Sequence, residues 1–329
     1  MNTNKKLFDV VYCFDTNFNK QAFASISSLL DNLSEKIDIH ILHNDLTTIK
    51  KLPDYIADHQ NLSEIYMYEF LHSDIVFPNL ETSHVSEATY YRLFIGEYIE
   101  TNAKYIVYID ADMICISNPV DSVKKVINNM ESTRFPIAAK TEIIRKLDDD
   151  ELEKHMQSSF FKKYWPFERL PINDKYFNAG FMIINLENWK KEKMFNKLID
   201  SMKKIKNEIV AWDQDVLNSV INGKYLELDS NFNFFSRHYN GQDDIIFLHY
   251  YGSKKPWTTD GIFLNSSEFY HENFRKVFRN RYHITHSWKK NSLKQILAAV
   301  VNFELFRLKY PVVYLREFIN SLFINSKDM

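Results

Sequence analysis

The chain has 329 residues, 45% of them apolar and only six of them glycine, so it can bury a large core and has few flexible linkers. A formal net charge of −2 argues against a general nucleic-acid-binding protein. Cys13 and Cys115 lie in apolar segments, which favours buried thiols in a reducing compartment over a disulfide framework. The N-terminal segment has no apolar stretch of the length that a signal peptide or membrane span needs, so we expect neither.

The first hundred residues alternate between β-prone and helical patterns. Phe8–Phe14 is apolar and predicts a strand, and Lys20–Leu33 has apolar residues at three- and four-residue spacing, which predicts a helix. Further expected strands and helices follow in order: Ile37–Leu42, Thr48–His59 (helix), Ile65–Phe70, Tyr90–Ile99 (helix) and Tyr105–Ile109. This alternation predicts an α/β fold with a mostly parallel sheet, in which ligands bind outside the carboxyl ends of the strands.

The segment VYIDADMICISNP, residues 107–119, ends an apolar run on two carboxylates, Asp110 and Asp112. One interpretation is a strand end that meets solvent, where Asp is an ordinary turn residue. The other starts from the two carboxylates at positions i and i+2 of an extended segment, which share one side and repel. A hard divalent cation such as Mg²⁺ or Mn²⁺ would remove that repulsion. The position after a strand favours a metal site.

Three later segments combine residues that suit phosphate, metal or sugar chemistry. YFNAGFMIINLENW, residues 176–189, is expected to enter an apolar strand through a turn at Asn178 and Gly180. AWDQDVLN, residues 211–218, places Asp213 and Gln214 at an expected helix start, where acidic residues are also ordinary caps. FLHYYGSKKPW, residues 247–257, joins a histidine, a glycine turn and two lysines. No glycine-rich phosphate loop occurs in the chain, so bound phosphates would need a metal or lysine.

These motifs, in this order, resemble the retaining glycosyltransferases of family 8, most closely the bacterial lipooligosaccharide galactosyltransferases. The resemblance covers roughly residues 7–260 and rests on TYYRLFIGEYI, VYIDADMICISNP, YFNAGFMIINLENW, WDQDVLN and HYYGSKKPW. It implies a GT-A fold, which is a single Rossmann-like α/β domain that binds a nucleotide sugar and requires Mn²⁺ or Mg²⁺. On this basis we assign residues 1–282 to the glycosyltransferase domain and expect a helical C-terminal tail.

The resemblance also implies roles for individual residues. The metal ligands would be Asp110, Asp112 and His249, with Ala111 between the two acids; the diphosphate would contact Lys255 and Gly252. Asp15 and Asn17 match the loop that contacts uridine, and Cys13 lies where the family has a small residue beside the base. The donor sugar would be surrounded by Arg92, Asn178, Asp213 and Gln214. Of these, Asn178, Asp213 and Gln214 are the candidate catalytic residues, with Asp213 or the Gln214 carbonyl near the anomeric carbon.

The chain departs from the galactosyltransferases in the region expected to contact sugar and acceptor. Those relatives carry a carboxylate soon after the strand that follows the two aspartates, whereas alignment here puts Thr141 at that place, with Glu142 next. A second difference is an aromatic cluster consisting of Phe160, Phe161, Tyr164, Trp165 and Phe167. The cluster fits either packing beneath a lid or a wall on which an acceptor sugar stacks.

Residues 283–329 form the expected tail. Helical apolar spacing recurs from Trp288 to Leu308 and from Val312 to Phe323, with Pro311 as the expected interruption. The tail carries a net charge of +4, from Lys289, Lys290, Lys294, Arg307, Lys309, Arg316 and Lys327 against Glu304, Glu317 and Asp328. An apolar stripe with basic excess suits a helix lying on an anionic membrane, although packing on the domain or in a dimer is the alternative.

We therefore expect a cytoplasmic enzyme, peripheral on the cytoplasmic face of the bacterial inner membrane. It would transfer galactose or glucose, with retention, from UDP-hexose to a lipopolysaccharide, lipooligosaccharide or other lipid-linked glycan. A protein acceptor, including the enzyme itself, is an alternative on the same site. An alternative of another class is a UDP-sugar-binding protein without catalysis.

Overall fold

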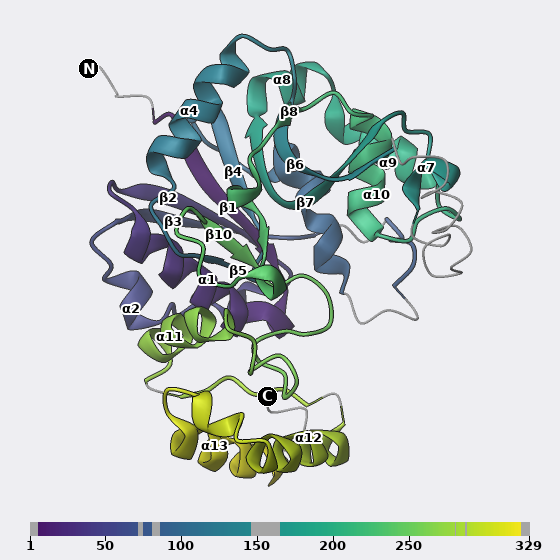
Figure 1. The fold of residues 1–329 in the computed structure, drawn as a ribbon. Helices are drawn as coiled ribbons and strands as arrows, with labels where there is room; N and C mark the ends of the chain where they lie inside the picture. The colour runs from purple at the N-terminus through teal and green to yellow at the C-terminus, as the bar shows by residue number, and fades with distance from the viewer. Residues whose placement is uncertain are drawn as a thin grey trace.

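The computed structural model describes residues 6–71, 75–80, 86–145, 165–279, 281–286 and 288–323. Its centre is a seven-stranded sheet with strand order β3-β2-β1-β4-β7-β6-β8 (Figure 1). Only β7 runs against its neighbours β4 and β6, so the predicted mostly parallel α/β sheet is confirmed. The strands are β1 Phe8–Phe14, β2 Ile37–His43, β3 Leu62–Glu69, β4 Tyr105–Ile109, β6 Ile137–Ile144, β7 Lys175–Asn185 and β8 Leu226–Glu227.

A second, three-stranded sheet has the order β5-β10-β9, with β5 Met113–Cys115, β9 Phe234–Phe235 and β10 Phe247–His249. The α-helices are α1 Asn19–Asn32, α2 Asp54–Ala57, α3 Ile95–Tyr98, α4 Val120–Glu131, α7 Pro166–Arg169, α8 Leu186–Lys191, α9 Met194–Lys204, α10 Trp212–Ile221, α11 Ser267–Val277, α12 Lys289–Val301 and α13 Pro311–Phe323. Short 3₁₀ helices cover Thr16–Phe18, Leu46–Thr48, Glu87–Phe94, Ser230–Phe232, Ser236–His238 and Leu305–Arg307.

Two apolar cores lie on the two faces of the large sheet. In β1, Val11 and Cys13 belong to the core shared with α8, α9 and α10, whereas Val10 and Tyr12 belong to the core shared with α1 and α4. This division follows from the alternation of side chains along a strand. Because both faces are covered, the central strands β1, β2 and β4 are buried along their whole length, as expected for a parallel sheet covered on both sides.

The small sheet is fastened to the large one at the carboxyl end of β4. The Asp110 N–H donates to the carbonyl of Gly180 in β7, at 2.8 Å. On the other side of the turn, the Cys115 N–H donates to Ser28 Oγ of α1, at 2.9 Å. The end of β4, the middle of β7 and the end of β10 therefore meet in one place, where the predicted site residues gather.

Three expected elements differ in the structure. The helix expected at Thr48–His59 is reduced to the four residues of α2, because Pro53 restricts the backbone before it. The helix expected at Tyr90–Ile99 is a 3₁₀ helix, Glu87–Phe94, that continues into α3. The turn expected at Asn178 and Gly180 was wrong, because both residues lie inside β7, where Asn178 pairs with Lys140 of β6.

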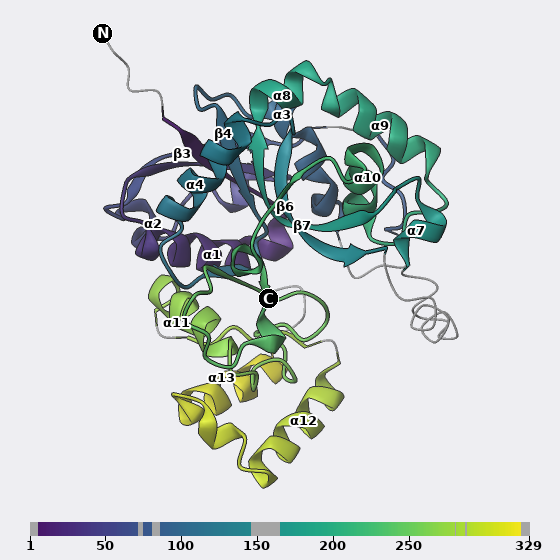
Figure 2. The ribbon, with the colours of Figure 1, turned by 45° about the horizontal axis from the view of Figure 1, so that its top comes forward.

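The C-terminal helices α12 and α13 lie beyond α11, at the end of the molecule opposite α8 and α9 (Figure 2). Their inner faces, through Ile296 and Phe318, pack on Ile262, Tyr282 and Ile284. Pro311 begins α13 instead of merely interrupting the tail, since a helix accepts proline in its first turn. Within the described residues, every helix is too short or too polar to cross a membrane.

Candidate functional site

Asp110, Asp112 and His249 converge at the end of β4. Their ligand atoms all lie within 4.8 Å of one another. His249 Nε2 is 3.4 Å from Asp112 Oδ1 and 4.0 Å from Asp110 Oδ2. The two carboxylates share one space because a tight turn joins β4 to β5, closed by the Met113 N–H on the carbonyl of Asp110 at 3.1 Å. The expected extended geometry was therefore wrong, but the expected convergence is confirmed.

The two carboxylates differ in their electrostatic surroundings. Burial alone would raise the pKa of Asp112, but the ammonium of Lys255 and the ring of His249 outweigh burial and lower it. The pKa of Asp110 is raised, mainly by burial. The positive charge of Arg92 offsets only part of this increase, and the negative charge of Asp112 adds to it. A further cation between them would favour the doubly ionised pair. Two carboxylates and one imidazole form a donor set that fits Mn²⁺ or Mg²⁺.

Arg92 connects this triad with the start of α10. Its Nη2 lies 2.8 Å from Asp110 Oδ1, and its Nε lies 3.0 Å from Asp213 Oδ2. Nη1 donates to the carbonyl of Ala179 at 2.8 Å, and the guanidinium lies over the ring of Tyr108. Although burial disfavours the charged guanidinium, the two carboxylates more than offset it and raise the pKa of Arg92. Arg92 is thus a fixed positive charge behind the candidate metal ligands.

A chain of amides orients His249. The Gly180 N–H donates to Asn178 Oδ1 at 3.0 Å, which identifies this atom as the amide oxygen. The same oxygen accepts from Asn233 Nδ2 at 2.8 Å. Asn233 must then present its Oδ1 to His249 Nδ1, 2.8 Å away. Nδ1 therefore carries a proton, which leaves Nε2, the atom that faces Asp110 and Asp112, as the one through which the ring could coordinate a cation. Asn233 could not be predicted from the sequence, because nothing in its local pattern marks it.

Gly180 leaves the room that the ring of His249 occupies. A Cβ at this position would lie 2.5 Å from Cε1 and 2.9 Å from Nδ1 of His249. Only glycine fits between the strand and the imidazole, which explains the glycine in the segment that was expected to be a turn.

Gln214 and Asn178 share one carboxylate, that of Glu142. Glu142 Oε2 accepts from Asn178 Nδ2 at 3.1 Å and from Gln214 Nε2 at 3.2 Å. Gln214 Oε1 accepts the Ala179 N–H at 3.0 Å, so both ends of this amide are fixed. Gln214 and Asn178 are therefore brought together, as predicted.

The site carboxylate is Glu142 and not a residue at position 141. The register of β6 against β7 shifts between Thr141 and Ile143, a bulge that re-aims the side chains there. Thr141 Oγ1 binds Glu227 and the hydroxyl of Tyr225, both at 2.5 Å, away from Gln214. The carboxylate beside Asn178 and Gln214 is therefore that of Glu142, the residue that follows the aligned Thr141.

Asp213 and Asp215, two residues apart at the start of α10, have different surroundings. Asp213 accepts from Thr89 Oγ1 at 2.7 Å and pairs with Arg92; burial raises its pKa to about 6, with Arg92 and Thr89 offsetting part of the effect. Asp215 is bound by Arg169 through two contacts of 2.7 and 3.0 Å and by two backbone N–H groups. Asp213 therefore belongs to the site, whereas Asp215 fastens α10 to α7.

The residues expected to contact uridine follow β1. Asp15 caps the 3₁₀ helix Thr16–Phe18 and accepts the Asn17 N–H at 3.0 Å. Cys13 is buried near Arg92, Asp110 and Asp213, and burial raises the pKa of its thiol. Gly252 adopts a left-handed backbone with φ of 83° beside the guanidinium of Arg237. Asn17 is exposed and makes no described contact with the metal triad.

The aromatic cluster is described only in part. Trp165 and Phe167 are buried in the core beside α9 and α10, which favours packing over an exposed sugar-binding wall for these two. Phe160, Phe161 and Tyr164 lie outside the described residues.

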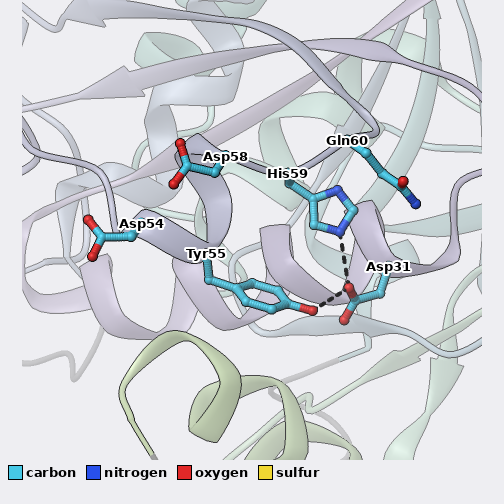
Figure 3. A pocket seen from close by; sticks show the side chains of 6 residues that line it. All are labelled: Asp31, Asp54, Tyr55, Asp58, His59 and Gln60. Atoms are coloured by element: carbon cyan, nitrogen blue, oxygen red, sulfur yellow. Dashed lines mark hydrogen bonds and ion pairs between the residues drawn. The ribbon is translucent and has the colours of Figure 1, made fainter.

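A separate depression of about 680 Å³ lies between the end of α1 and the region of α2 (Figure 3). One of its carboxylates, Asp31, accepts from Tyr55 Oη at 2.7 Å and His59 Nε2 at 3.1 Å, and pairs with Lys276 at 2.6 Å. The carboxylate already has partners, and no described cluster of metal-type ligands lies there. The depression therefore does not compete with the triad as a reaction centre.

Among curated proteins, the chain is 28% identical to a lipopolysaccharide 1,3-galactosyltransferase of Salmonella typhimurium, over 80% of this chain and 76% of that protein. It is 24% identical to a lipopolysaccharide 1,2-glucosyltransferase of Escherichia coli, over 98% and 91%. It is also 24% identical to general stress protein A of Bacillus subtilis, over 81% and 93%. The relatives thus include proteins named for different transferred sugars.

Among solved structures, galactosyltransferase LgtC, crystallised with donor and acceptor sugar analogues, superposes with a TM-score of 0.59. It shares 20% identity, over 86% of this chain and 99% of LgtC, so the likeness supports the GT-A fold. The family model described as Glycosyl transferase family 8 matches residues 9–261, which include every predicted site residue. The chain therefore belongs to glycosyl transferase family 8.

Proposed function

We propose that the protein transfers a hexose, galactose or glucose, from UDP-hexose to a glycan of the lipopolysaccharide or lipooligosaccharide type, with retention and with Mn²⁺ or Mg²⁺. The observation that carries this proposal is the convergence of Asp110, Asp112 and His249 within 4.8 Å, with Lys255 beside them. The relatives named for lipopolysaccharide galactosyl and glucosyl transfer support the choice of substrates.

In this proposal the leaving group is a nucleoside diphosphate. The divalent cation, when bound, supplies positive charge to the phosphate oxygen that leaves the sugar. Lys255 adds a second positive charge there, as electrostatic catalysis requires. Asp110, Asp112 and His249 hold the cation, while Asp15, Asn17, Cys13 and Gly252 surround the rest of the nucleotide.

On the sugar side, positive charge develops at the anomeric carbon. Asp213 and the carbonyl oxygen of Gln214 are the candidate groups that stabilise it, and Asn178 and Glu142 would bind sugar hydroxyls. Because Asp213 is already paired with Arg92, it is poorly suited to act as a free nucleophile. We favour attack of the acceptor hydroxyl on the same face of the sugar that the phosphate leaves. The departing phosphate then takes the proton of that hydroxyl.

The proposal is tested by UDP release from a panel of UDP-sugars, without acceptor, with Mn²⁺ or with EDTA. We expect UDP release from one of the UDP-sugars, and we expect EDTA to abolish that release. The UDP-sugar that is cleaved is then the donor. Failure to bind UDP in the presence of Mn²⁺ would overturn the proposal. Incubation with labelled UDP-glucose and no acceptor distinguishes the self-modifying alternative, since only then is the chain itself labelled. Tight UDP binding without release or transfer to any acceptor would favour the non-catalytic alternative.

Asn233→Ala is expected to weaken the apparent affinity for Mn²⁺ by about 10–100-fold, because His249 loses the partner that fixes its tautomer and orientation. Metal titration by calorimetry measures the effect. Asn240→Ala, at an exposed position, is the matched control and should bind Mn²⁺ as the parent does. Equal affinity in Asn233→Ala and the control would show that Asn233 does not orient His249.

The rate of UDP-sugar hydrolysis is expected to fall as the pH decreases through about 6, the value to which burial raises the pKa of Asp213. Below it the carboxylate is protonated and loses the negative charge that faces the sugar, so kcat/KM should fall about tenfold per pH unit. The profile is measured at saturating Mn²⁺. Asp213→Asn should be slow and lack this acidic limb; an unchanged limb would assign it to another group.

We propose that α12 and α13 lie on an anionic membrane surface. These helices and the turn after α12 carry exposed apolar side chains, among which Val301 is 75%, Phe303 72% and Val312 78% exposed. The tail's basic excess suits acidic headgroups. This orientation would bring the enzyme to a lipid-linked acceptor.

The double variant Phe303→Asp/Val312→Asp is expected to bind phosphatidylglycerol vesicles at least about tenfold more weakly, since it places two charges in the apolar face. Vesicle co-sedimentation of the full chain measures this. Val76→Asp, at an 81% exposed valine outside the tail, controls for surface charge. Undiminished binding of the double variant would contradict the proposal, and a change in oligomeric state instead would favour a dimer contact.

A further inference from the structure

Next to His249 lies a group of aromatic and basic side chains to which the proposed donor chemistry assigns no role. We call Lys140, Phe235, Arg237 and Tyr251 the basic shelf. The rings of Phe235 and Tyr251 stack in parallel, with centroids 5.3 Å apart and an interplanar angle of 10°. Tyr251 is 42% exposed, so the stack borders on solvent at the edge of the site.

The ammonium of Lys140 is held at this stack. Its Nζ lies 4.5 Å from the centroid of Phe235 and donates to the carbonyl of Asn233 at 2.9 Å. Burial lowers the pKa of Lys140, and Glu142 offsets part of that effect. Among the described residues, no carboxylate comes within ion-pair distance of Lys140 or Arg237. Lys140 therefore has hydrogen-bonding capacity left for a ligand, since an ammonium has three donors.

The strand order places Lys140 and Phe235 on the other side of β10 from Asp112 and Lys255. In the small sheet, β10 with His249 lies between β5, which follows Asp110 and Asp112, and β9, which carries Phe235. Lys255 pairs with Asp112 on the β5 side, whereas Lys140 reaches β9 from β6. Arg237 donates to the carbonyl of Tyr251 at 3.2 Å and lies beside Gly252, so it borders both the shelf and the proposed diphosphate site.

We propose that the acceptor is an anionic glycan whose carboxylate or phosphate is bound by Lys140, while its sugar ring packs on Phe235 and Tyr251. Aromatic faces suit the apolar face of a sugar ring, and a charge-assisted hydrogen bond to Lys140 selects the anion. Arg237 adds long-range attraction for the same charge. The inference rests on the proposed function, because it names the acceptor of that reaction.

The test compares the binding of three methyl glycosides to the full chain with UDP and Mn²⁺ present: a neutral glucoside, a glucuronide and a glucoside 6-phosphate. The expected result is at least about tenfold tighter binding of one anionic glycoside than of the neutral one, with the preference reduced at high salt. Which anion is preferred distinguishes a uronic acid from a sugar phosphate. In Lys140→Met the ratio of the affinities for the anionic and the neutral glycoside should fall to about one. Lys190→Met, at an exposed lysine of α8, should keep the ratio of the parent protein.

Equal binding of the three glycosides, no binding of any, or a preference that survives Lys140→Met would overturn the inference. So would a loss of UDP affinity without a loss of the preference, because the shelf would then serve the donor. UDP binding is measured separately on each protein. Intact Mn²⁺-dependent UDP binding alongside a negative glycoside result leaves the proposed function standing, whereas absent UDP binding removes both.

Discussion

Replacing Asp112 with Asn is expected to lower the rate of UDP release from the preferred UDP-sugar by about two to three orders of magnitude. Asp112 is one of only two carboxylates in the triad, and Lys255 and His249 lower its pKa, so it is ionised throughout the working pH range. The amide keeps the size and removes the charge. The variant therefore loses a proposed metal ligand and the ionic partner of Lys255 without leaving a cavity.

The rate is measured as UDP release with Mn²⁺ and with EDTA, alongside Mn²⁺ affinity by calorimetry. Asp58→Asn is the matched control, because Asp58 is an exposed acid at the depression near α2. We expect the control to retain full activity and Asp112→Asn to show little difference between Mn²⁺ and EDTA. Undiminished Mn²⁺-dependent release from Asp112→Asn would remove Asp112 from the metal site and with it the central argument of the proposal.

The position of Asp110 and Asp112 at the edge of the sheet could be predicted from chain topology, whereas His249 and Lys255 were assigned to the same site through the family resemblance. Residues that follow the carboxyl ends of neighbouring strands meet at one edge of the sheet, whatever the details of packing. The same reasoning places Asp15 after β1. A residue's position relative to a strand end is a local property, and it can be recognised in the sequence.

Contacts that depend on exact register could not be predicted. Glu142 reaches Gln214 only because β6 has a bulge, and alternating hydrophobicity does not show where one residue is inserted. Asn233 reaches His249 through the pairing of β9 with β10, two strands too short to give a pattern. These partners determine how the predicted ligands are oriented, so the sequence gives the identity of the site more reliably than its geometry.

Replacing Arg92 with Met is expected to destabilise the protein by about 3–5 kcal/mol at pH 8, because it leaves two buried carboxylates without their cation. Arg92 pairs with Asp110 at 2.8 Å and with Asp213 at 3.0 Å, and its side chain is only 8% exposed. Methionine fills a similar volume, so the loss is mainly electrostatic. Arg279→Met, at a 91% exposed arginine, should change stability by less than about 0.5 kcal/mol and serves as the control.

The dependence of this loss on pH separates electrostatics from packing. Without Arg92 the pKa values of Asp110 and Asp213 should rise further above the ordinary 3.8. At pH values between the ordinary and the raised pKa, the folded variant therefore binds more protons than the unfolded chain. Its stability should therefore fall as the pH rises, and urea unfolding should show a smaller loss at pH 5 than at pH 8. Adding Asp213→Asn to Arg92→Met should recover part of the loss at pH 8, since one unpaired charge is gone. An equal loss of stability at both pH values, with no recovery in the double variant, would mean that Arg92 stabilises the fold through packing. The ion pairs of Arg92 with Asp110 and Asp213 would then not explain its effect on stability.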